Sequence, residues 1–162
     1  MDKSSLKPAH LRRIKSLALL NHAQLESFLD YVELVACGKP QTIVKESQPG
    51  DSMFLILEGQ CRVYLGLKRG EPLFLRLLEA GDAFGEIALL NQGVRTAGVE
   101  TTRESLLLKV SASSLEKLVS EQPALAAQFL YHLSRSLGRQ LSDLTKRLRA
   151  GREMKDVLSL IG

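Results

Sequence analysis

The sequence holds few of the residues that build metal centres, disulfide frameworks or catalytic sites. Its 162 residues include only two cysteines, Cys37 and Cys61, and these are not spaced as a CxxC pair. This pattern indicates neither a zinc site nor a disulfide framework. The three histidines, His10, His22 and His132, are scattered, and we find no paired carboxylates, metal cluster or nucleophile elbow. We therefore expect no bound metal and no enzymatic activity.

The sequence also lacks the segments that direct a chain into or across a membrane. No apolar run approaches the roughly 20 residues that span a bilayer. The basic stretch at residues 1–15 has no apolar segment followed by a small-residue cleavage site, which a secretory signal requires. With the unpatterned cysteines, which indicate a reducing compartment, this predicts a cytoplasmic protein that does not contact a membrane.

Basic residues concentrate at the two ends of the chain. The formal net charge is +4, with five Lys or Arg against one acidic residue in residues 1–20 and seven against three in residues 131–162. Basic ends can attract nucleic acid or a membrane surface. Because no aromatic or glycine-rich element accompanies them, we favour the interpretation that they are solvated faces of terminal helices.

Hydrophobic spacing divides the chain into three zones. The first zone is helical and the second is rich in strands. Residues 9–35 favour helices, because Asn21 and Gln24 match a capping box that precedes apolar residues at helical spacing. In residues 42–110, short apolar runs alternate with turn signals such as residues 49–51. Turns about 8–12 residues apart with strands between them predict a small antiparallel barrel or sandwich.

The third zone, residues 113–149, returns to helical patterning. Ser113 or Ser114 is placed to cap a short helix, and Ser111, Ser113 and Ser114 are better explained as caps than as nucleophiles. Pro123 suits the first turn of a longer helix. A glycine weakens that helix beyond residue 149, so residues 150–162 are expected to form a short tail.

Residues 84–97 carry the clearest binding signal, in the segment FGEIALLNQGVRTA between two expected strands. If Gly85 opens a helical turn there, the first amides of the turn lack intrahelical partners and attract a phosphate. Glycine also lets a ligand approach the backbone closely. Arg95 supplies a planar, permanently charged fork that suits phosphate oxygens. Glu86 is placed to accept hydrogen bonds from sugar hydroxyls.

This segment resembles the phosphate-binding cassette of the cyclic nucleotide-binding domain family, which includes the bacterial catabolite activator protein, cyclic-nucleotide-gated channels and regulatory subunits of protein kinase A. The family pattern is F-G-E-[LI]-A-L-L, a short loop, then R-[STA]-A, and every constrained position is filled. The resemblance covers roughly residues 11–148. It implies one α+β domain at residues 1–149: a small antiparallel β-barrel or jelly roll of cupin-like form, with N-terminal helices, a short phosphate-binding helix and a long C-terminal helix.

The resemblance implies a role for each matching position. Glu86 would hold the ribose 2′-hydroxyl, and Arg95 would pair with the phosphate oxygens. The rest of the cradle would consist of main-chain amides, one hydroxyl and two apolar walls: Gly85, Ile87, Ala88, Ala97, Thr96, Val63 and Leu75. The long helix would cap the purine, with Ser136, Arg139 and Gln140 as candidates. The alternative for Glu86 and Arg95 is a surface ion pair that contributes little.

The implied function is a non-enzymatic sensor of a cyclic mononucleotide, cAMP or cGMP. We favour cAMP, although Thr96 is of a type found in relatives that prefer either ligand. Gly98 stands where the family usually has a larger β-former. With a basic rim of Arg95, Arg135 and Arg139, it leaves a cyclic dinucleotide such as cyclic di-GMP as an alternative ligand. A protein-interaction scaffold that has lost its ligand is a further alternative.

A heptad seam follows in the long helix, with steps of four and three residues. Its positions are Leu130, Ser134, Leu137, Leu141, Leu144 and Leu148. This seam predicts a homodimer through the C-terminal helix; the alternative is that the stripe packs on the chain's own barrel. Residues 151–162 are too few for a DNA-binding domain. We therefore expect either a stand-alone sensor that acts through an unidentified protein partner or a piece of a longer chain.

Overall fold

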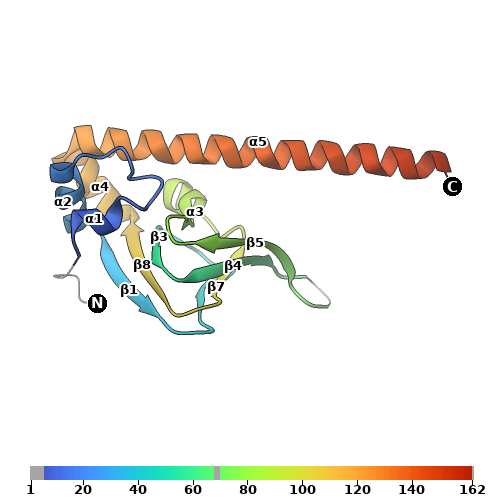
Figure 1. The fold of residues 1–162 in the computed structure, drawn as a ribbon, viewed down its shortest axis with the longest axis horizontal. Helices are drawn as coiled ribbons and strands as arrows, with labels where there is room; N and C mark the ends of the chain where they lie inside the picture. The colour runs from blue at the N-terminus through green and yellow to red at the C-terminus, as the bar shows by residue number, and fades with distance from the viewer. Residues whose placement is uncertain (1–5, 68–69, 162) are drawn as a thin grey trace.

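Two four-stranded antiparallel sheets face each other in a β-roll (Figure 1). The first sheet has the order β1-β8-β3-β6 and the second the order β2-β7-β4-β5. The structure, a computed structural model, describes the backbone of residues 6–67 and 70–161 and the side chains up to residue 151. The strands are β1 (Glu33–Cys37), β2 (Thr42–Val44), β3 (Ser52–Glu58), β4 (Gln60–Leu65), β5 (Leu73–Glu79), β6 (Ala83–Phe84), β7 (Gly98–Thr101) and β8 (Ser105–Ser111). The predicted antiparallel barrel or jelly roll is confirmed.

Helices gather at one end of the roll and along one side of it (Figure 1). They are α1 (Pro8–Leu11), α2 (His22–Phe28), a 3₁₀ turn (Leu29–Tyr31), α3 (Glu86–Asn91), α4 (Ala112–Glu121) and α5 (Pro123–Ile161). The 39 residues of α5 make a helix roughly 58 Å long at 1.5 Å per residue. It therefore runs past the roll and projects beyond it.

The N-terminal boundary of the roll differs from the sequence prediction. The helical zone predicted for residues 9–35 ends earlier, because β1 begins at Glu33, and the roll predicted from residue 42 begins there too. β1 pairs with β8, with Val35 opposite Leu107, so the tertiary pairing overrides a weak local signal. The capping box is confirmed: the Gln24 amide donates to Asn21 Oδ1 and the Asn21 amide donates to Gln24 Oε1, each at 2.9 Å.

Two C-terminal boundaries also need correction. The cap of α4 is Ser111, whose hydroxyl accepts from the Ser114 amide at 3.1 Å, rather than Ser113 or Ser114 themselves. The helix expected to end near residue 149 continues to Ile161, so most of the predicted tail at 150–162 is helical. One glycine costs a helix only about 1 kcal/mol, and the flanking Arg, Glu, Met, Lys and Leu residues are good helix formers.

The core has two parts, and β3 separates them. Alternate residues of β3 point to opposite faces, so Met53 and Leu55 join the cluster beneath the helices while Phe54 and Ile56 join the interior of the roll. Both faces of β3 are thus buried, which explains its unbroken apolar run. The free thiols of both cysteines also lie in the roll interior.

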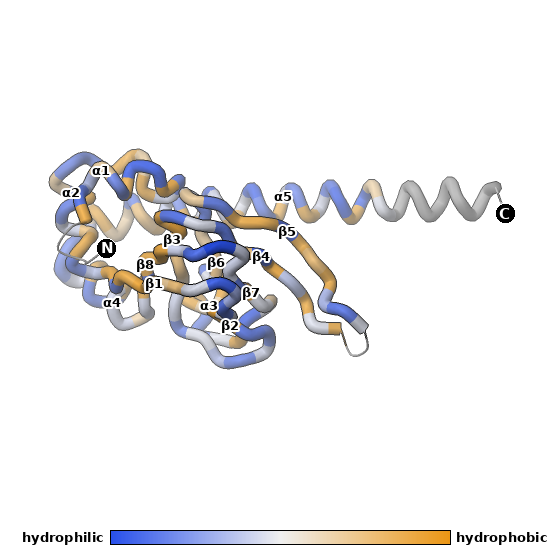
Figure 2. The backbone as a smooth tube through the Cα atoms, turned by 60° about the horizontal axis from the view of Figure 1, so that its bottom comes forward, coloured by the Kyte–Doolittle hydropathy of each residue, from blue (hydrophilic) through white to orange (hydrophobic). Residues whose placement is uncertain are grey.

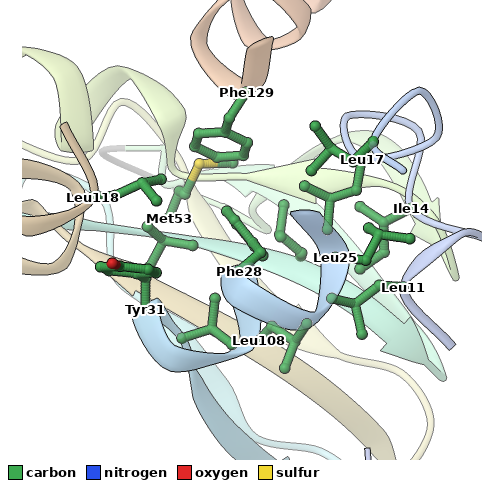
Figure 3. Close-up of a cluster of buried hydrophobic side chains, with 14 of the residues drawn as sticks. Leu11, Ile14, Leu17, Leu25, Phe28, Tyr31, Met53, Leu108, Leu118 and Phe129 are labelled. Carbon is green, nitrogen blue, oxygen red and sulfur yellow. The ribbon is translucent and has the colours of Figure 1, made fainter. Parts of the chain in front are cut away.

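The start of α5 is anchored in the cluster beneath the helices (Figure 3). The rings of Phe129 on α5 and Phe28 on α2 lie 5.1 Å apart, and Leu125 and Leu133 are also buried. Farther along α5, hydrophobic positions recur, and hydrophobic positions also follow β5 (Figure 2). The chain itself does not cover all of those on the helix, since Leu148 is 67% exposed. In the described part of the chain, no helix is both long and apolar enough to cross a membrane.

Candidate functional site

A left-handed turn joins β6 to α3 and begins the site. Gly85 has φ +83°, and a Cβ at this position would lie 2.7 Å from Arg95 Nη1 and 2.9 Å from the Ser52 carbonyl oxygen. Only glycine combines that dihedral with that close approach. The Leu89 amide donates to the Gly85 carbonyl at 3.1 Å. The amides before Leu89 therefore lack an intrahelical acceptor, as expected for the first turn of a helix.

Arg95 lies against this turn, with only 7% of its surface exposed. Its guanidinium donates to the Ser52 carbonyl at 2.5 Å, to the Ser52 hydroxyl at 3.0 Å and to the Gly85 carbonyl at 3.4 Å. Gly50 leaves room for it, because a Cβ there would collide with the guanidinium. Burial lowers the pKa of Arg95, an effect that the charge of Asp51 partly opposes.

The arginine has no carboxylate partner within ion-pair distance among the residues whose side chains are described. The alternative of a surface ion pair with Glu86 is therefore wrong: both side chains are buried and they are not paired. Buried cations are ordinarily paired with an anion, because desolvation of the charge is costly. In the described part of the chain, the hydrogen bonds of the Arg95 guanidinium go to neutral acceptors alone.

Glu86, in the first turn of α3, is 6% exposed and connects three elements. Its Oε1 atom accepts a hydrogen bond from Gln140 Nε2 on α5 at 2.8 Å. Gln140 Oε1 in turn accepts one from Arg76 Nη2 on β5 at 3.2 Å. This chain of hydrogen bonds joins the cassette to the long helix.

A cavity of about 100 Å³ lies between the turn, Arg95 and α5. The predicted site residues that line it are Val63, Gly85, Glu86, Ile87, Ala88, Arg95, Thr96, Ala97 and Gln140. The lining residues that the sequence analysis missed are Val44, Arg76, Phe84 and Val99. Phe84 had a sequence signal, since it opens the cassette motif, and it is held by stacking on Phe54 with ring centroids 5.1 Å apart.

Leu75, which the sequence analysis predicts as a wall of the site, is not among the residues that line this cavity. Strand alternation places Arg76 on the same face as buried Leu78, and therefore places Leu75 on the outer face, where it is 40% exposed. The register confirms this, because Val63 faces Arg76, Tyr64 faces Phe74, and the shift between them leaves Leu75 as the extra residue of a bulge. Arg76 thus takes the position predicted for Leu75.

Two of the predicted cap residues line a neighbouring cavity instead. Ser136 and Arg139 border a space of about 520 Å³ between α5, β5 and the N-terminal segment. The two cavities share Arg76, Glu86 and Gln140. Of the three predicted caps, only Gln140 therefore reaches the smaller cavity.

Gly98 does not enlarge the site, although its small size suggested extra room. It pairs with Tyr64, whereas its neighbour Val99 pairs with Val63, and these two valines line the cavity. Because side chains alternate along a strand, Gly98 faces the other side of the sheet. A Cβ there would collide with the Tyr64 ring. The aromatic ring covers the glycine on the outer face, as in other glycine–aromatic strand pairs.

This pairing predicts a stability defect without a binding defect. Gly98→Val is expected to destabilise the fold by about 1–3 kcal/mol, the usual cost of overpacking, in urea denaturation. Combining it with Tyr64→Ala removes the obstructing ring, so the two changes should be non-additive by about 0.5–3 kcal/mol. Equal stability of Gly98→Val and the unaltered chain would show that the ring does not hold this position.

Comparison of the sequence with known proteins finds a matching domain family and several related proteins. The family model described as cyclic nucleotide-binding domain matches residues 35–122. A CRP-like cAMP-activated global transcriptional regulator of Mycobacterium tuberculosis is 28% identical over 74% of this chain and 54% of its own length. The cGMP-dependent protein kinase, isozyme 1, of Drosophila melanogaster is 32% identical over 68% of this chain and 15% of its own length.

Comparison with solved structures finds the same fold. The crystal structure of a cyclic nucleotide-binding domain from Methylobacillus flagellatus superimposes with a TM-score of 0.77 and 19% identity, covering 86% of this chain and 83% of that one. The chain spans about half the length of the bacterial regulator and a smaller share of the kinase. The matched segment contains the whole cassette from Phe84 to Ala97 and most of the roll. The chain belongs to the cyclic nucleotide-binding domain family.

Proposed function

We propose that this domain is a non-enzymatic sensor of a cyclic mononucleotide, cAMP or cGMP. The observation that carries the proposal is the buried guanidinium of Arg95, which lies against the turn at Gly85, lines the cavity and has no carboxylate partner among the described side chains. A ring phosphate satisfies this site because it carries one negative charge and accepts several hydrogen bonds.

The parts of the nucleotide are assigned by chemistry. The phosphate contacts Arg95 together with the amides of Gly85, Ile87, Ala88 and Ala97 and the Thr96 hydroxyl. The ribose 2′-hydroxyl donates to Glu86, which is buried beside them. Val63 and Gln140, both in the lining of the cavity, contact the sugar and the base.

We propose that α5 relays occupancy of the site. In this structure Glu86 accepts a hydrogen bond from Gln140 of α5, and a ribose hydroxyl competes with Gln140 for the same carboxylate. Binding thus alters a contact that holds α5 against the cassette. The resulting population shift is limited by the difference in ligand affinity between the two positions of the helix. The exposed leucines farther along α5 form a homodimer seam, through which the signal reaches a partner protein.

Ligand-dependent stability tests the proposal. A ligand present at 100 times its dissociation constant adds about 2.7 kcal/mol to the free energy of unfolding. We expect such a shift with cAMP or cGMP, measured by thermal or urea denaturation, and a much smaller shift with 5′-AMP or 5′-GMP, in which the phosphate ring is open. A shift with cyclic di-GMP alone would replace the proposed ligand with a dinucleotide. The absence of any shift would favour a scaffold that has lost its ligand.

A further inference from the structure

A larger cavity, of about 520 Å³, adjoins the cavity at Arg95. Three parts of the chain form its walls: the N-terminal segment at residues 15–18, the chain from β5 to β6 at residues 76–83, and α5 at residues 132–143. Sites for small molecules commonly measure about 300–1,000 Å³, and the cavity at Arg95 holds only about 100 Å³. Arg95 does not line the larger cavity. The larger cavity therefore has room for a ligand of its own.

The carboxylates that line the larger cavity already have partners. Asp82 forms an ion pair with Lys15 of the N-terminal segment. Glu86 accepts a hydrogen bond from α5 at 2.8 Å, and Asp143 lies 4.0 Å from the Lys146 ammonium on the same helix. The negative charges at the cavity are thus each matched by a donor or a cation of the protein itself.

Two guanidinium groups on different walls of the larger cavity have no anionic partner. Arg76 of β5 and Arg139 of α5 both line it, and neither forms an ion pair with a carboxylate whose side chain is described. Arg76 donates one hydrogen bond, at 3.2 Å, to the neutral oxygen of Gln140. A guanidinium has five N–H donors in a planar fork that matches the oxygens of a phosphate. The cavity therefore offers two cationic donors to a bound anion.

Two serines add hydroxyl groups to the same cavity. Ser136 precedes Arg139 by three residues on α5, so the two share a face of the helix, and both line the cavity. Ser16, on the N-terminal wall, is 7% exposed, and its hydroxyl has no hydrogen-bond partner in the part of the chain that the structure describes. Buried hydroxyls ordinarily have a partner. A bound molecule that reaches this wall would supply one.

We propose that the larger cavity binds a small phosphate-bearing molecule other than the cyclic nucleotide, and that its occupancy raises the affinity of the cassette for the nucleotide. The second half rests on the proposed function. Arg76 lines both cavities and bonds Gln140, which in turn bonds Glu86. Hydrogen bonds to a phosphate are roughly twice as strong as those between neutral groups, so an anion in the larger cavity draws Arg76 away from Gln140. A less firmly held Gln140 competes less with the ribose for Glu86.

Inorganic pyrophosphate is the probe for the site itself, titrated at constant ionic strength by isothermal titration calorimetry. Arg139→Gln is expected to weaken its binding roughly 5- to 10-fold, between the loss of an exposed ion pair and that of a hydrogen bond to a charged group. Arg135→Gln is the matched control and should bind normally: Arg135 lies over the Tyr131 ring on the same helix and does not line the larger cavity. No binding to the unaltered chain, or an equal loss in both variants, would overturn the inference. So would a loss in Arg95→Ala with none in Arg139→Gln, because the anion would then lie in the cassette.

Titrations of cAMP and cGMP with and without saturating pyrophosphate measure the coupling. Pyrophosphate is expected to tighten cyclic nucleotide binding roughly 2- to 10-fold, the equivalent of one neutral hydrogen bond, and the nucleotide should tighten pyrophosphate binding by the same factor. In Gln140→Ala the factor should fall to one, because the connecting amide is gone. An unchanged affinity in the unaltered chain would refute the coupling, and mutual exclusion would show that the nucleotide itself fills the larger cavity. If neither nucleotide binds while pyrophosphate still binds through Arg139, the proposed function is refuted and the phosphate site stands.

Discussion

Replacing Arg95 with alanine is expected to weaken cyclic nucleotide binding by about 2–5 kcal/mol, the loss seen when one partner of a buried charge pair is removed. At 1.4 kcal/mol per tenfold change, this corresponds to roughly a 30-fold to several-thousand-fold rise in Kd. The effect is large because the phosphate would stay desolvated in the cavity without the buried guanidinium that is proposed to pair with it. Isothermal titration calorimetry measures it.

Three controls accompany this measurement, and the first separates a loss of binding from a loss of folding. Arg95 also donates to the carbonyl and hydroxyl of Ser52, so its removal leaves buried acceptors that cost about 1–3 kcal/mol of stability. Circular dichroism must therefore show that the variant is folded at the titration temperature. Arg95→Lys keeps the charge and loses the planar fork, so an intermediate affinity is expected. Arg103→Ala, at an exposed position outside the cavity, should bind normally. Full affinity in Arg95→Ala would remove Arg95 from the site.

The second large effect concerns the C-terminal helix. Leu141→Glu combined with Leu144→Glu is expected to convert a dimer into a monomer, detected by light scattering. The two leucines are 66% and 54% exposed in the single chain, and burial of each contributes about 1.5–3 kcal/mol. In a symmetric dimer both copies carry both substitutions, so four leucine side chains are lost from the interface. Because each side chain is already partly covered in the single chain, the total loss is roughly 4–7 kcal/mol, which weakens association by about several-hundred-fold or more.

The control for this variant lies on the same helix. Lys146 is exposed and lies at an outer heptad position relative to the seam at Leu141 and Leu144. Lys146→Glu therefore changes charge without entering the seam and should remain dimeric. A double variant that stays dimeric would exclude the seam. A monomeric unaltered chain would show that these leucines are not a self-association surface at the concentration measured.

The roll and the cassette could be predicted because their signals are local. Short apolar runs between turn residues follow from the two-residue period of strands. Gly85 indicates a turn that requires positive φ, and the structure has φ +83° there. Arg95 and Glu86 stand at fixed spacing from that turn, so the structure brings them to one cavity.

The residues that the sequence analysis missed depend on long-range geometry. Ser52, which holds Arg95, lies 43 positions away along the chain, and no local pattern marks it. In β5 the run LFLRLL is apolar on both sides of Arg76, so alternation cannot show which face is inward. The phase is set by Leu78, which is buried opposite Cys61, and by the bulge at Leu75. Neither the burial nor the bulge is visible in the sequence.

The end of α5 was mispredicted for a related reason. The glycine at 151 predicts a helix end, but propensity is a weak prior, and a helix that is anchored elsewhere tolerates the cost of one glycine. Phe129 and Leu133 anchor the start of α5 in the core, and propagation from an existing helix avoids the cost of a new nucleus. The helix therefore continues to Ile161.

A crystal structure of the chain with cGMP would locate the phosphate itself. We expect phosphate oxygens within about 3 Å of the Arg95 guanidinium and of amides in the first turn of α3, with a ribose hydroxyl on Glu86. Density for the nucleotide elsewhere, with Arg95 still bonded only to Ser52 and Gly85, would contradict the assignment of this cavity as the binding site.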